Sequence, residues 1–138
     1  MGKIKAHEID PKEKHEVIGD FFGIVSGLKS KKEVINFFVG LMTSSELLMA
    51  ARRIQIARML LGDKSYFEIK EKLKVGNDTI FRTDKWLNSR GEEYKAWICR
   101  CIEKNDRQKI DNKKDNKTSW SMMDKYPEYR VWKDLLSR

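Results

Sequence analysis

The chain has 138 residues, a length that suits one compact domain with extensions and argues against two independent domains. Charged residues make up 36% of it, and 29 Lys and Arg against 21 Asp and Glu give a net charge of +8. This excess favours a polyanionic partner, because Lys and Arg that neutralise phosphates release condensed counterions. Many small cytosolic proteins are basic as well, so composition alone leaves both interpretations open.

Two segment types are not expected in this sequence. The first twenty residues mix acidic and basic side chains around no apolar core, which argues against a signal peptide. No apolar run approaches the roughly 18 residues of a membrane span. We therefore expect a cytoplasmic protein that does not contact a membrane. Only 2 Pro occur and no run of alternating β-branched residues is present, so the fold class is predicted to be all-α.

The first predicted helix begins at Pro11, because Pro suits the first turn of a helix. Apolar side chains recur from there at helical spacing and end near Leu28. Residues 1–10, which lack such a pattern, are expected to form a disordered tail. This helix opens the folded domain, which we predict to span residues 11–104.

Three further helix starts are predicted from a repeated motif. A Ser or Thr followed three residues later by Glu is typical of a capping box, in which each side chain bonds a backbone amide near the other. The pairs are Ser30 with Glu33, Thr43 with Glu46, and Ser65 with Glu68. The helix that follows Thr43 is expected to run to Leu61. It should stop at Gly62-Asp63, where Gly adopts the left-handed cap conformation.

That third helix carries more apolar side chains than one packed face requires. A helix that is apolar nearly all round is buried on several sides. In a domain this small, a second copy of the chain would cover the additional side, so we predict a homodimer. The alternative is a helix at the centre of a monomeric bundle. The apolar residues of this helix are Leu47, Leu48, Ala50, Ala51, Ile54, Ile56, Ala57, Met59, Leu60 and Leu61.

Residues 65–88 have the pattern of a helix-turn-helix. The first helix would present Tyr66, Ile69 and Leu73 inward at steps of three and four. A tight turn follows, and a second amphipathic helix spans about residues 77–88. Two short helices joined in this way typically place the second one in the major groove of DNA.

The remaining third of the chain divides into three parts. A helix is predicted beyond Gly91, and it should reach Glu103 or beyond. Residues 105–118 are strongly charged and predict a linker or a solvated helix extension. Residues 119–138 regain apolar side chains and are expected to pack on the dimer or on a partner. Those side chains are Trp120, Met122, Met123, Tyr126, Tyr129, Trp132, Leu135 and Leu136.

The two cysteines, Cys99 and Cys101, form a single Cys-x-Cys pair. His7 and His15 are remote from them in sequence, so no zinc-ligand pattern is complete. We interpret both cysteines as ordinary thiols and expect no metal.

The sequence resembles the Trp-repressor family, and within it the YerC/YecD-like branch. The segments that carry the resemblance are SKKEVINFFVGLMTSSELLMAARRIQIARMLLGDKSYFEIKEKL and DTIFRTDKWLN, and the similarity extends over roughly residues 11–98. The resemblance implies an all-α, intertwined homodimer whose two reading heads meet successive major grooves of a palindromic operator. It implies a DNA-binding transcriptional regulator, and we expect a repressor.

The resemblance also implies where a corepressor pocket would lie. Tryptophan-sensing members use a Thr and two Arg, which match Thr43, Arg53 and Arg82. They also need a Gly and a Ser where this chain has Thr83 and Trp86. Tryptophan is therefore not expected as a corepressor, and no cofactor is predicted. The alternative for the two Arg is a helix-helix ion pair or a phosphate clamp.

The predicted DNA-facing residues fall into two classes. Base edges would be read by Asn77, which suits adenine, by Phe81, which suits a thymine methyl, and by Asp78, which suits a cytosine amine. A helix-capping bond is the favoured use of Asp78. Phosphates would be contacted or approached by Thr79, Arg82, Lys85, Lys70 and Lys72.

The turn departs from what the family pattern favours. Lys74 occupies a position that normally takes Gly because it needs a positive φ, at a cost of around 1 kcal/mol. Gly76 stands where a Ser cap is common.

Two functions from different classes remain open at this point. The first is a regulator that binds double-stranded DNA as a homodimer. The second is a dimeric protein-interaction module of the same fold, in which Asp78 and Asp84 spoil the groove face and the C-terminal aromatic segment makes the contact. An enzyme is disfavoured, because no His, Cys or paired carboxylates converge on a nucleophile or an acid-base pair.

Overall fold

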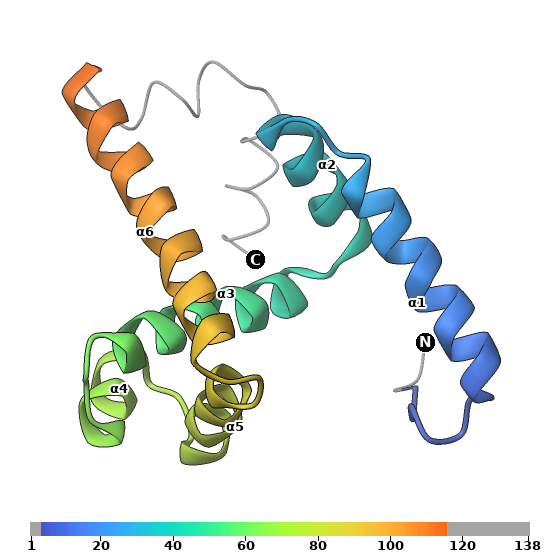
Figure 1. The fold of residues 1–138 in the computed structure, drawn as a ribbon, viewed down its shortest axis with the longest axis horizontal. Coiled ribbons are helices and arrows are strands. Elements are labelled where there is room, and N and C mark those ends of the chain that lie inside the picture. The colour runs from blue at the N-terminus through green and yellow to red at the C-terminus, as the bar shows by residue number, and fades with distance from the viewer. Residues whose placement is uncertain (1–3, 116–138) are drawn as a thin grey trace. The chain divides into compact units, whose positions relative to one another are not determined.

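The computed structural model describes residues 4–115, and the side chains of residues 4–111. This part of the chain forms helices and no strand (Figure 1), which confirms the all-α prediction. The chain divides into two compact units, one ending at Leu41 and the other beginning at Met42. The helices are α1 (Pro11–Ser26), α2 (Lys31–Leu41), α3 (Ser44–Leu61), α4 (Tyr66–Leu73), α5 (Asn77–Asn88) and α6 (Glu92–Asp115).

Local capping bonds set where these helices begin. Asp10 accepts hydrogen bonds from the amides of Lys12 and Glu13, and Pro11 occupies the first turn of α1. At α2, Ser30 accepts from the Glu33 amide, as a capping box requires. The Glu33 carboxylate, however, accepts from the Lys29 amide, one residue earlier than the predicted box places it.

The boxes at the starts of α3 and α4 are complete, as predicted. Thr43 Oγ1 accepts from the Glu46 amide at 3.2 Å, and the Glu46 carboxylate accepts from the Thr43 amide at 2.8 Å. Ser65 and Glu68 form the same pair of bonds. Because a backbone amide donates to each carboxylate, the pKa of Glu46 and the pKa of Glu68 lie below the ordinary value.

The first unit is an α1–α2 pair with an aromatic contact at its centre. The rings of Phe21, Phe37 and Phe38 pack together, with the Phe37 and Phe38 centroids 5.3 Å apart. No residue of α1 or α2 is buried. Val17 and Phe22 are among the large apolar side chains that α1 leaves in contact with water.

The second unit builds its core from α3, α4 and α5. Ile56, Ile69, Leu73 and Ile80 form one buried cluster. Half-buried apolar side chains pack around it, namely Met59, Leu60, Tyr66 and Val75. This core holds α4 and α5 against the C-terminal half of α3, and we call α3, α4 and α5 the head of the protein.

Two left-handed residues mark the ends of α3 and α4. Lys74 has φ 53° and ψ 46°, and its amide bonds the Lys70 carbonyl, so the turn has the positive φ predicted there. At the end of α3 the prediction was wrong. Gly62 keeps φ at −89°, and Asp63 adopts the positive φ of 56°. The Gly62 amide already bonds the last α3 carbonyls, and Asp tolerates the left-handed region better than most residues.

Helix α6 is longer than the segment with helical periodicity. It runs from Glu92 to Asp115 and so continues as helix through the charged residues after position 104. Arg58 of α3 donates to Asp106 of α6 at 3.0 Å, which ties the two helices together. The aromatic segment 119–138 lies outside the described residues.

The thiol of Cys99 lies on α6 and is half-buried. Burial and the nearby Glu103 carboxylate raise the pKa of the Cys99 thiol, which disfavours the thiolate. No group of three or more His, Cys, Asp or Glu in the described residues could hold a metal ion. Nor is any helix in this part of the chain long and apolar enough to cross a membrane.

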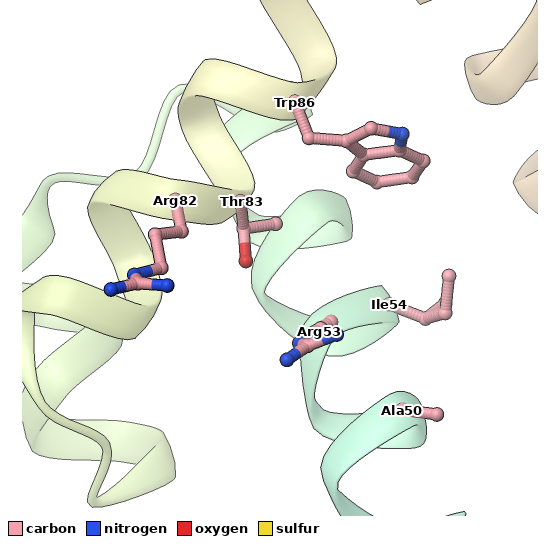
Figure 2. Close-up of a pocket in the computed structure, with 6 residues that line it drawn as sticks. All are labelled: Ala50, Arg53, Ile54, Arg82, Thr83 and Trp86. Carbon is pink, nitrogen blue, oxygen red and sulfur yellow. The ribbon is translucent and has the colours of Figure 1, made fainter. Parts of the chain in front are cut away.

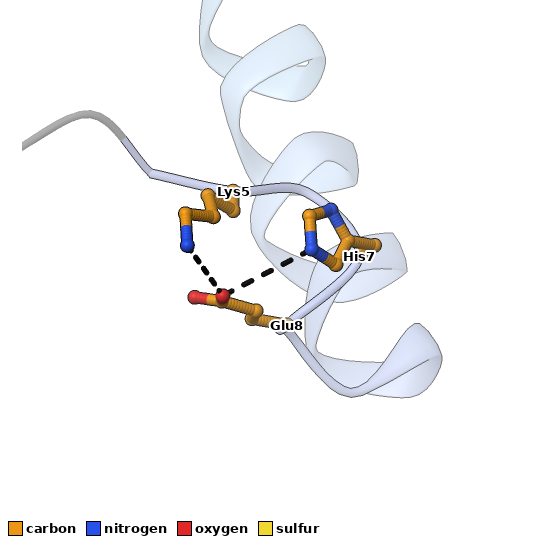
Figure 3. Close-up of polar contacts among 3 residues, drawn as sticks. All are labelled: Lys5, His7 and Glu8. Atoms are coloured by element: carbon orange, nitrogen blue, oxygen red, sulfur yellow. Dashed lines mark hydrogen bonds and ion pairs between the residues drawn. The ribbon is translucent and has the colours of Figure 1, made fainter.

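The segment before α1 makes a turn with local polar contacts (Figure 3). Lys5 Nζ lies 3.0 Å from Glu8 Oε1, and His7 Nε2 lies 3.9 Å from the same atom. All three side chains are exposed, so these pairs contribute little to stability.

Candidate nucleic-acid interface

Helix α5 has one face fixed in the core and the opposite face in solvent. Ile80, Thr83 and Leu87 are its buried residues. The opposite face carries four exposed side chains spaced at three and four residues, which places them in one stripe. They are Asp78, Phe81, Arg82 and Lys85, and we call them the outer stripe. The structure thus brings together four of the residues that the sequence assigned to DNA.

The other predicted contacts lie off this stripe. Asn77 is exposed at the start of α5, whereas Thr79 is half-buried and lies beside the turn. Lys70 and Lys72 are exposed on α4. Two positions apart on a helix, they point to opposite sides, flanking the buried face of that helix.

Asp78 makes a contact that the sequence interpretation did not anticipate. Its Oδ2 lies 2.8 Å from Nε of Arg82, one turn further along α5. The expected capping bond from Asp78 to the first turn is not formed, and Gly76, at the cap position, has no side chain to supply one. Arg82 is opposite in charge and four residues away on the same helix, so it can bind the Asp78 carboxylate in place of a backbone amide.

Asp84 is directed toward α4 and away from the outer stripe. It accepts a hydrogen bond from the Tyr66 hydroxyl at 2.6 Å and one from the Asn88 amide group at 2.8 Å. The phenol donates to a carboxylate, so the pKa of Tyr66 is raised. Asp84 is therefore a link between α4 and α5, and its charge is already satisfied inside the head.

A cavity of about 500 Å³ lies between α3 and α5, within the second unit. Figure 2 shows the Trp86 ring on one side of it and the Arg53 and Arg82 side chains on another. Thr83 also lines the cavity, and its hydroxyl donates to the Thr79 carbonyl of the same helix. The full lining consists of Ala50, Arg53, Ile54, Arg82, Thr83 and Trp86.

The predicted corepressor residues meet only in part at this cavity. Arg53 and Arg82 line it together, but Thr43 is not among its lining residues and serves as the cap of α3. Arg82 pairs with Asp78 of its own helix, so the helix-helix ion pair suggested for it is not formed in the described residues.

An aromatic cluster fixes the Trp86 ring, and the sequence interpretation missed it. The indole N–H donates to the Tyr94 hydroxyl at 3.0 Å, and the two rings pack edge to face. The Trp97 ring packs against Tyr94 at a tilt, and the Arg90 guanidinium lies 5.2 Å from the Tyr94 ring centre. The available signal was the row of aromatic residues on either side of the Gly91 break. The cluster joins the end of α5 to the start of α6.

Comparison with known proteins now identifies the family. A family model described as Trp repressor protein matches residues 16–102, more than half of the chain. This chain belongs to the Trp-repressor family. It is also similar to the uncharacterized protein YerC of Bacillus subtilis (strain 168), with 28% identity over 103 residues. That match covers 75% of this chain and 90% of the relative.

Membership in the Trp-repressor family relates two helices of the head to a known DNA-binding motif. The family is one of helix-turn-helix DNA-binding regulators, and α4 and α5, joined by the turn at Lys74, are the helix-turn-helix of this member.

Proposed function

We propose that this protein is a transcriptional repressor that binds double-stranded DNA as a homodimer and inserts α5 into the major groove of a palindromic operator. The observation that carries the proposal is the outer stripe, a row of polar and aromatic side chains exposed on a helix whose opposite face is anchored in the core. A rigid helix with one solvated, side-chain-rich face can enter a groove without rearrangement.

Several residues of the head have chemically suitable roles in this proposal. Asn77 and Phe81, near the start of α5, would meet an adenine edge and a thymine methyl. Lys85 would contact a phosphate, and Thr79 would approach one beside the turn. Lys70 and Lys72 would flank the DNA backbone from α4.

The proposed dimer follows from apolar surface that the described residues leave uncovered. Helix α3 exposes Leu48, Met49 and Ile54, although it lies at the centre of the head. We expect a second chain to cover them, because a helix that is apolar nearly all round is buried on several sides. A two-fold dimer would cover the same patch on both chains and set two α5 helices at a fixed spacing.

We infer that the cavity beside α5 does not bind tryptophan. Thr83 and Trp86 line it and fill space that an indole ring would need, and Trp86 is held in place by Tyr94. Recognition of DNA would then need no corepressor. We place the protein in the cytoplasm, where its DNA partner would be.

The alternative is a protein-interaction module without DNA binding. It assumed that the Asp84 carboxylate would repel DNA at the groove-facing side of α5, whereas Asp84 is half-buried and bonded to Tyr66. Its proposed contact surface, residues 119–138, lies outside the described residues. It remains the outcome to accept if DNA binding fails.

Fluorescence anisotropy with a random-sequence duplex at low and at moderate salt tests the proposal. We expect micromolar or tighter binding whose logarithm falls linearly with the logarithm of salt concentration, with no effect of added tryptophan. Lys85→Glu on the outer stripe should weaken binding at least about tenfold, because it replaces a phosphate contact with a repulsion. Lys104→Glu makes the same charge change on α6 and should have a much smaller effect.

The absence of salt-sensitive binding at micromolar protein would overturn the proposed function. Equal losses from the α5 variant and the α6 variant would show that α5 is not the DNA-facing helix.

A further inference from the structure

The ion pair on the outer stripe is unusual for a surface that is meant to attract phosphates. Asp78 and Arg82 lie 2.8 Å apart, and their side chains are 75% and 77% exposed. An ion pair in such contact with water adds little to the stability of the fold. Its position on the DNA-facing side of α5 therefore calls for a reason other than stability.

A phosphate contact fits this pair poorly. A phosphate that approached the Arg82 guanidinium would also approach the Asp78 carboxylate, and the two anions would repel each other. The pair as a whole carries no net charge, so it would release few counterions on binding. Lys85 lies one turn further on the same stripe and forms no ion pair with the described residues, so it is the better phosphate ligand.

A guanine edge fits the pair well. Guanine presents two uncharged acceptors, N7 and O6, to the major groove, and the guanidinium fork matches them with two parallel N–H donors. The carboxylate occupies Nε of Arg82, which leaves the two terminal nitrogens of the guanidinium to act as that fork. The carboxylate also restricts a long, flexible side chain to fewer conformations before DNA arrives.

The geometry points to a guanine-reading unit composed of Arg82 and Asp78, a role that rests on the proposed DNA-binding function. Arg82 donates to O6 and N7 of one guanine in each half-site. Asp78 is a positioning residue that holds the guanidinium through Nε. This assignment replaces the phosphate contact that the sequence suggested for Arg82, and it makes Arg82 a determinant of sequence specificity.

The test compares base preference with overall affinity. Duplexes bound by the full-length protein are selected from a random library, and dissociation constants are measured for the best site and for its three single-base variants at the recurrent guanine. The wild-type protein should prefer guanine by about 5- to 150-fold, the discrimination typical of one bidentate contact. Arg82→Ala should reduce this preference to within about twofold. Arg82→Lys should do the same while keeping the salt dependence, because Lys retains the charge but lacks the fork.

Asp78→Asn gives a signature that a purely repulsive role of Asp78 would not produce. Removal of a negative charge from the groove face should tighten binding to every duplex. If Asp78 positions Arg82, the preference for guanine should fall at the same time. Lys85→Ala is the matched control, and it should weaken all four duplexes by a similar factor and leave the preference intact.

Three outcomes would overturn this inference. Arg82→Ala could weaken all duplexes equally, Asp78→Asn could tighten binding without changing base preference, or the selected sites could lack a recurrent guanine. Each of these leaves the proposed function standing, because the wild-type protein still binds DNA. Failure of the wild-type protein to bind any duplex would instead overturn the proposed function and this inference with it.

Discussion

The two units of this protein bury their apolar side chains to different extents. In the head, Ile56, Ile69 and Ile80 have no exposed surface, and short helices pack around them. In the α1–α2 unit no residue is buried, and side chains such as Phe22 remain 62% exposed. The head therefore has its own core, whereas the N-terminal helices carry apolar surface that a further surface must cover. We propose that α5 of the head binds DNA, and that the exposed apolar side chains of α1, α2 and α3 form the interface between the two chains of a dimer.

The largest expected effect is a loss of stability when one buried side chain of the head is truncated. Ile69→Ala should lower the free energy of unfolding by about 2–5 kcal/mol, because it removes buried methyl groups and leaves a cavity. Denaturant titration followed by circular dichroism measures this change. Phe67→Ala on the same helix is the control. Phe67 is 72% exposed, so its truncation should change stability by no more than about 0.5 kcal/mol.

Similar losses from Ile69→Ala and Phe67→Ala would contradict this account of the head. That result would mean that the outer surface of α4 is buried in the native assembly.

The next effect should appear in assembly. Phe22→Glu places a charge on the apolar surface of α1, and burying it in a dimer interface without a partner should cost at least about 3 kcal/mol. This corresponds to a dissociation constant raised by more than about 100-fold. Analytical ultracentrifugation over a range of concentrations measures the shift from dimer to monomer. Asn36→Asp, which makes the same change in net charge at an exposed polar position of α2, should leave the dimer intact.

A wild-type protein that is monomeric at all concentrations would contradict the assignment of α1 and α2 to the dimer. An unaltered dimer in Phe22→Glu would contradict it as well.

The smallest of these effects concerns the turn between α4 and α5. Lys74 has a left-handed backbone, which costs an L-residue about 1–2 kcal/mol and costs Gly almost nothing. After allowance for the greater flexibility of unfolded Gly, Lys74→Gly should stabilise the head by about 1 kcal/mol. Lys72→Gly, inside α4, should destabilise it by a similar amount. Thermal unfolding of both variants shows whether the signs are opposite, and two destabilised variants would contradict the turn geometry.

Features that depend on neighbours in the sequence were predicted well. The capping boxes at Thr43 and Ser65 and the strained turn at Lys74 need only local backbone geometry, and the structure confirms all three. The family resemblance, carried by a long ungapped segment, was confirmed by the family match.

Features that depend on competition between partners were not predicted. Asp78 had two possible partners, a backbone amide and Arg82, and the sequence gives no energy difference between them. Gly62 and Asp63 competed for the left-handed position in the same way. The Trp86 to Tyr94 bond and the Arg58 to Asp106 bond join different helices, so they become visible only once the helices are packed.

We propose that the two heads of one homodimer both bind DNA through α5. Selection of bound duplexes from a random library with the full-length protein tests it most directly. We predict an inverted repeat whose half-sites are centred about one helical turn, roughly 10 base pairs, apart and that binds two chains per duplex. A single asymmetric motif bound by one chain, or no enriched sequence at all, would contradict it.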